Sequence, residues 1–148
     1  MSRILQVPAS LSFIAPLLTR LVIGYAFYLT GRGKLANPEQ TTGFFNRLGI
    51  PFPAANATFI GYLETFGGLL LILGLATRPA AALLACTMFV ALITAHREDF
   101  IKTIGGDLTD IPALMFLLPL LWLVFFGPGK VSFDALIARK FGRKKELR

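Results

Sequence analysis

The sequence contains one cysteine, Cys86, and one histidine, His96. A single cysteine excludes an intrachain disulfide, a CxxC redox pair and a cysteine zinc cluster. A single histidine excludes haem ligation by two histidines of the same chain. We therefore expect neither a metal site nor a covalently bound cofactor.

Charged residues are also scarce, at 16% of the 148 residues, whereas soluble domains carry about 25%. Hydrophobic residues make up 55%, the mean hydropathy is +0.67, and the apolar residues are gathered into long blocks. This pattern predicts an integral membrane protein, and the length suits a single domain over residues 1–148.

Four apolar blocks are long enough to cross a bilayer as helices, since about 20 helical residues span the hydrocarbon core. Arg20 interrupts the first block and Glu64 the second. The sequence therefore predicts an all-α fold, a bundle of four transmembrane helices, with spans at about residues 10–30, 57–76, 79–95 and 109–126.

The charges between the spans predict the orientation. One side, with both termini and the turn between the second and third spans, holds nine basic and two acidic residues. The other side holds five of each. Because basic loops stay inside, we expect a multi-pass protein of the plasma or inner membrane with both termini cytoplasmic. This one-sided charge also argues against a nucleic-acid partner.

A short helix is expected on the outer surface, between the first two spans. Asn37 is a candidate N-cap, Pro38 suits the first helical position, and Gly49 is a stop signal. Phe44 and Phe45 would share one face. We expect this helix to lie flat on the membrane interface, the alternative being an irregular loop.

The basic tail, residues 130–148, reads as an amphipathic helix with Ser132 as its N-cap. Its cationic side chains suit the headgroups of anionic lipids. The alternatives are a solvated tail and a contact with a partner protein.

Glycines spaced seven apart occur in both of the first two spans, namely Gly24 and Gly31, and Gly67 and Gly74. Seven residues are two helical turns, so each pair lies on one helix face. Such small residues allow two membrane helices to approach closely.

Arg20 and Glu64 are the charges inside the spans. In antiparallel helices they would lie about 15 and 10 Å from the outer surface. An arginine facing lipid costs about 2.5–3.5 kcal/mol even on the lenient insertion scale. We therefore expect Arg20 to pair with Glu64. The pair is either purely structural or also lines a ligand or proton site.

Further polar residues gather at the same end and extend this pair to a candidate polar pocket of Arg20, Glu64, Tyr62, His96 and Asp110. His96 is alternatively an interfacial residue, and Asp110 a helix-start acid favoured by the dipole. Cys86 is expected to be a small buried packing residue. No catalytic residue is identified.

Four collinear motifs resemble the DoxX family of small four-helix membrane proteins: RLVIGYAFYLTGRGKL, LGIPFP, ETFGGLLLILGLATRPAA and GPGKVSFD. The resemblance implies an integral membrane protein of a prokaryotic cell envelope. By the same resemblance, the recurring arginine, glutamate and histidine of the family match Arg20, Glu64 and His96. The acid of the fourth span matches Asp110 or Asp107.

The resemblance also implies association with membrane redox systems. The leading hypothesis is a quinone-linked redox subunit, which is not catalytic alone because the chain lacks ligands for haem, iron–sulfur or flavin. It would need a redox-enzyme partner. The alternatives are a non-catalytic scaffold and a small-solute carrier, which would require a homo-oligomer.

Overall fold

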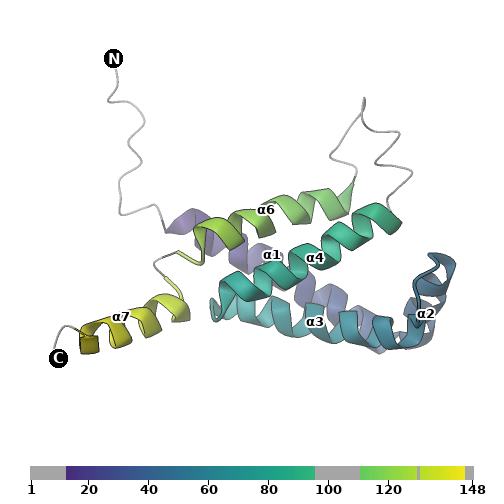
Figure 1. Ribbon diagram of the computed structural model, residues 1–148, viewed down its shortest axis with the longest axis horizontal. Coiled ribbons are helices and arrows are strands. Elements are labelled where there is room, and N and C mark those ends of the chain that lie inside the picture. Colours follow the sequence, from purple (N-terminus) through teal and green to yellow (C-terminus); the bar gives the residue numbers. More distant parts are fainter. Residues whose placement is uncertain (1–12, 96–110, 130, 146–148) are drawn as a thin grey trace, which may run out of the picture.

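A computed structural model of the chain describes residues 13–95, 111–129 and 131–145. Within these ranges every regular element is a helix and there is no strand (Figure 1). The elements are α1 (Ile14–Ala36), α2 (Pro38–Arg47), α3 (Pro53–Leu73), α4 (Thr77–Thr94), α6 (Pro112–Phe126) and α7 (Phe133–Lys145).

Three of the described helices, α1, α3 and α4, are long and apolar enough to cross a membrane. The fourth apolar helix, α6, has 15 residues and contains Pro119. The first helix is longer than expected. Gly31 and Gly33 do not end it, and the helix continues to Ala36 before the chain turns at Asn37, which precedes Pro38. This extension brings Lys34 into a helix instead of a loop.

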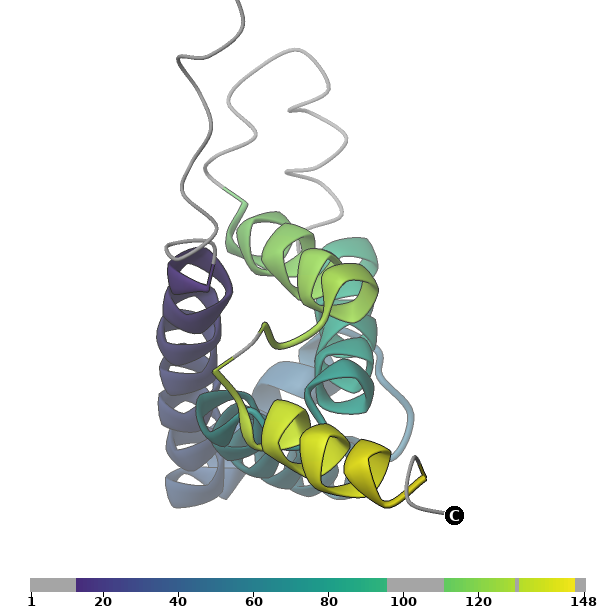
Figure 2. The same cartoon turned by 90° about the vertical axis from the view of Figure 1, so that its left-hand side faces the viewer.

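The long helices surround a common core, as the view along the bundle shows (Figure 2). α1 packs most extensively on α3, and α4 on α6. Fully buried side chains from α3, α4 and α6 meet in this core, namely Leu71, Leu84, Leu120 and Leu123. We call the two ends of the bundle the α2 end and the α7 end.

Glycines set the close contact between α1 and α3. A Cβ at Gly24 would lie 2.7 Å from Gly68 O, and a Cβ at Gly31 would lie 2.5 Å from Thr65 N. The expected close approach is therefore present: Gly61 and Gly68 of α3 contact α1, and a Cβ at Gly74, just after α3, would lie 2.6 Å from Cζ of Arg20 of α1. Gly67 faces Leu84 of α4 instead.

The α7 end is held by caps. α3 ends at Gly74, whose φ of +69° and hydrogen bonds to Leu70 and Leu71 form a Schellman motif. The Asp134 carboxylate accepts hydrogen bonds from the backbone N–H groups of Ala76 and Thr77, at 2.8 and 2.9 Å, and so caps α4. α7 is thereby tied to the turn between α3 and α4.

The two expected short helices are both present. α2 begins at Pro38, and Gly49, with a φ of +70°, follows it as a stop. Asn37 donates from its amide to Gly33 O at the end of α1, so its side chain caps the preceding helix rather than α2. Ser132 is the N-cap of α7, accepting from Ala135 N at 3.1 Å.

Candidate functional site

Glu64 lies in the middle of α3 with 2% of its side chain exposed, and its partner is Lys34 near the end of α1. Lys34 Nζ lies 2.5 Å from Glu64 Oε2. Burying an unpaired carboxylate would cost several kcal/mol, and the contact with the Lys34 ammonium offsets part of that cost.

Arg20 does not pair with Glu64, contrary to the sequence-based expectation. It is buried at the α7 end, where its guanidinium donates to backbone carbonyls. Nε donates to Leu71 O at 3.1 Å, and Nη1 donates to Pro128 O at 2.7 Å and to Val131 O at 2.9 Å. Arg20 thus joins α1 to the end of α3 and to the α6–α7 connection.

The register of the α1–α3 contact explains this difference. Gly24 faces Gly68 and Gly31 faces Gly61, so a step toward the start of α1 is a step toward the end of α3. Four residues before Gly24 in α1, the same register places Arg20 beside the end of α3, near Leu71. Glu64 precedes Leu71 by seven residues, about 10 Å along the helix axis. In the same register Lys34 is level with Thr58, about 9 Å along the axis from Glu64, and its long side chain reaches the carboxylate.

Two cavities adjoin the Lys34–Glu64 pair. The first, which we call the interhelical cavity, has a volume of about 190 Å³ and is lined by α1, α3, α4 and the start of α6. Thr30 and the ion pair are polar, and the remaining lining is apolar, with Phe27, Met88 and Phe116 among it.

The second is larger, at about 570 Å³, and we call it the α2–α3–α4 groove. Its apolar walls include Phe44 of α2, Phe59 and Leu63 of α3, and Leu83 of α4. Lys34 and Glu64 line both the groove and the interhelical cavity, so the ion pair stands between the two.

The other predicted pocket residues are not all at this site. Tyr62 is 52% exposed and stacks on Phe66, with ring centroids 6.1 Å apart, and it lines neither the groove nor the interhelical cavity. His96 and Asp110, like the alternative Asp107, lie outside the described residues.

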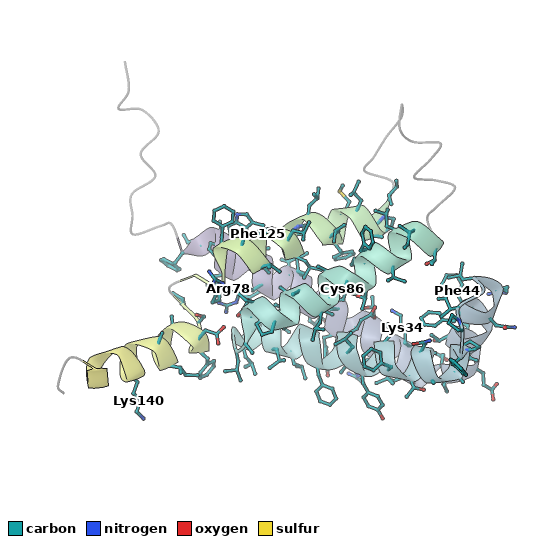
Figure 3. All side chains as sticks on the ribbon, viewed as in Figure 1. Lys34, Phe44, Arg78, Cys86, Phe125 and Lys140 are labelled. Atoms are coloured by element: carbon teal, nitrogen blue, oxygen red, sulfur yellow. The ribbon has the colours of Figure 1, made fainter. Side chains whose placement is uncertain are left out.

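Cys86 is exposed and lines the groove, which corrects the expectation of a buried packing residue. Figure 3 shows it midway along α4, with Lys34 closer to α2. It is the one cysteine of the chain and therefore a natural position for a chemical label in the groove.

Lys34 is the site residue that sequence reasoning missed. The sequence does carry a signal for the register of the two helices, because Gly24 and Gly31 have a matching seven-residue pair in Gly61 and Gly68. Aligning these two pairs in antiparallel helices places Tyr28 level with Glu64, with Arg20 eight and Lys34 six residues out of level. The alignment therefore argues against a level Arg20–Glu64 pair but does not by itself select Lys34.

The arrangement has the chemistry of a ligand site within a membrane. Ligand pockets of about 300–1,000 Å³ are mostly apolar with a few placed polar groups, and the groove fits this description. Ionisable residues inside spans commonly mark substrate or proton pathways. The pair offers an ammonium donor and a carboxylate acceptor at the wall of an apolar space.

Known proteins resemble the chain over most of its length. It is 32% identical to the uncharacterized membrane protein Rv3486 of Mycobacterium tuberculosis, over 82% of this chain and 80% of that protein. It is 29% identical to the inner membrane protein YphA of Escherichia coli, over 80% of this chain and 86% of the other.

A third relative carries an enzymatic name. The Bacillus subtilis protein named "Putative oxidoreductase CatD" is 38% identical over 55% of this chain and 59% of its own length. No solved structure matches the chain.

The family assignment rests on residues 15–97, which match the DoxX family and include α1, α2, α3 and α4. This range contains Arg20, Lys34 and Glu64, and it covers more than half of the 148 residues. The apolar helices and the membrane-protein relatives agree with it. The chain is a membrane protein of the DoxX family.

Proposed function

We propose that this protein is a membrane subunit of a quinone-linked redox system, and that the α2–α3–α4 groove holds the quinone. The observation that carries the proposal is the Lys34–Glu64 pair at the wall of a 570 Å³ apolar groove. A quinone needs an apolar slot for its tail and a few polar groups for its ring oxygens.

The name of one relative, "Putative oxidoreductase CatD", supports a redox role without identifying a substrate. In this proposal the subunit exchanges electrons through a partner enzyme, because a sequence with one cysteine and one histidine offers no ligand set for an iron–sulfur cluster or a haem held by two histidines. It binds and orients the quinone, and Glu64 and Lys34 are positioned to exchange protons with it.

The proposed topology has four spans, with α6 as the fourth and both termini in the cytoplasm. All four apolar helices run between the α2 end and the α7 end. The α7 end then faces the cytoplasm, and α7 lies against anionic lipid with exposed Phe133, Leu136 and Ile137. α2 lies at the outer surface.

The test of the function is the quinone content of protein purified gently from native membranes, measured by solvent extraction and mass spectrometry. We expect close to one quinone per chain in the wild type and little in Glu64→Gln. Arg32→Gln is the matched control, because Arg32 is exposed, stacks on Tyr28 and lines neither cavity.

Absence of quinone from the wild type would refute the proposal. If quinone is absent and Glu64→Gln is less heat-stable, the Lys34–Glu64 pair is structural, and a non-catalytic scaffold becomes the better account.

A further inference from the structure

The α2–α3–α4 groove is closed at one side and open at another. Phe45 is buried and Leu48 half-buried where α2 covers its end. On the α3–α4 side, in contrast, Phe59 and Leu83 are exposed although they line the groove, and so is Cys86. Cys86 is the tenth of the 18 residues of α4. The open side therefore lies at mid-length of two candidate membrane spans, where the surroundings are hydrocarbon.

Lys34 is the polar group of the groove best placed to contact a ligand. An ammonium has three N–H donors, and among the described residues its recorded acceptor is Glu64 Oε2 alone. The side chain of Lys34 is 27% exposed, against 2% for Glu64. Thr87 donates to Leu84 O and Asn56 to Pro51 O, so both are already committed to backbone carbonyls.

Resting on the proposed function, we infer that the groove is loaded sideways from the bilayer, through the α3–α4 side where Cys86 lies, by a long-tailed amphiphile whose headgroup oxygen accepts a hydrogen bond from Lys34. The apolar tail lies against Phe59 and Leu83, and the headgroup reaches the ion pair. A ligand arriving from water would instead enter at the end covered by α2, where Phe45 is buried.

The first test uses the single cysteine of the wild-type protein in bilayers. Cys86 is labelled with a bimane maleimide, and its fluorescence is quenched either by phosphatidylcholine brominated on the acyl chains or by aqueous iodide. We expect quenching by the brominated lipid and little by iodide. Quenching by iodide, with or without the lipid, or by neither agent, would overturn the inference.

The second test measures how a ligand protects Cys86 from N-ethylmaleimide. The probe is a fully ring-substituted benzoquinone with a decyl chain, because its ring has no position open to thiol addition. We expect saturable protection in the wild type. In Lys34→Met the half-protecting concentration should rise roughly 10- to 100-fold, the factor that a charge-assisted hydrogen bond contributes.

Lys34→Arg keeps the donor and should stay within a few-fold of the wild type, and Arg32→Gln should not change the protection. An equal effect of Lys34→Met and Arg32→Gln would overturn the role of Lys34. Quinone retained by purified protein without lipid access to Cys86 would overturn the sideways loading and leave the proposed function standing. Lipid access to Cys86 without retained quinone would refute the function and leave the open side of the groove established.

Discussion

Lys34 of α1 and Glu64 of α3 form an ion pair between two apolar cavities, with Nζ 2.5 Å from Oε2. The pair links the longest described helix to its neighbour, and the walls of the two cavities around it are mostly apolar. Charges in such surroundings are expensive to maintain. Their presence at the groove is the reason for treating the pair as a site and not only as packing.

Removing one partner of the pair should destabilise the protein more than removing both. Lys34→Met leaves the Glu64 carboxylate buried without a cation, which costs about 3–5 kcal/mol. The double variant Lys34→Met/Glu64→Leu leaves no charge behind and should be close to the wild type. Thermal unfolding in detergent measures the stability of the wild type, the single variants and the double variant, which together form a double-mutant cycle. With Glu64→Leu as the other single variant, a loss in the double variant equal to the sum of the two single losses would show that the two side chains do not interact.

Arg20 should act on stability and not on binding. Arg20→Met leaves the carbonyls of Pro128 and Val131 without a donor, whereas Leu71 O keeps its hydrogen bond from Gly74 N. At about 1.5 kcal/mol or more for each hydrogen bond to a charged group, we expect a loss of at least roughly 3 kcal/mol. Thermal unfolding tests the loss. Folded Arg20→Met should still bind quinone as the wild type does, since the groove is at the other end of α3.

Gly31 and Gly33 make a matched pair on α1. A Cβ at Gly31 would lie 2.5 Å from Thr65 N, whereas a Cβ at Gly33 meets nothing within 4 Å. Gly31→Ala should therefore push α1 from α3 and lower the melting temperature. Gly33→Ala should leave it unchanged or raise it, because alanine favours a helix over glycine by about 1 kcal/mol. The same response in both variants would contradict the close contact.

Asp134 should contribute more to the stability of the protein than an N-cap residue that contacts only its own helix. Asp134→Ala removes the acceptor for the N–H groups of Ala76 and Thr77, and losing an N-cap costs about 0.5–2 kcal/mol. It also frees the start of α7 from the α3–α4 turn. Ser132→Ala removes the cap of α7 and a hydrogen bond to Gly129 O but leaves the Asp134 contacts with α4 in place, and it is the control. We expect faster proteolysis of the tail in both variants, but a lower melting temperature only in Asp134→Ala.

The sequence carries strong signals for the helices and weak ones for their contacts. Pro38 and Gly49 predict α2, and Ser132 predicts the start of α7, because caps and stops depend on local residues alone. The partners of Arg20 are backbone carbonyls. Because every residue type has a carbonyl, no residue in the sequence identifies these partners. Pairing Arg20 with Glu64 was wrong for that reason.

The orientation of side chains around α4 was equally hard to predict. The helix is apolar on nearly every face, so its sequence does not separate a buried side from an exposed one. Cys86 could therefore be assigned to the interior although it lies at the groove. Lys34 was missed because the first span was ended before it.

The most direct test of the central claim is equilibrium binding of the decyl benzoquinone to delipidated protein in nanodiscs. The wild type and Arg32→Gln should bind saturably, close to one quinone per chain. Lys34→Met/Glu64→Leu should lose this binding while keeping its melting temperature. Saturable binding that survives in the double variant, or none in the wild type, would contradict the assignment of the Lys34–Glu64 pair as a quinone site.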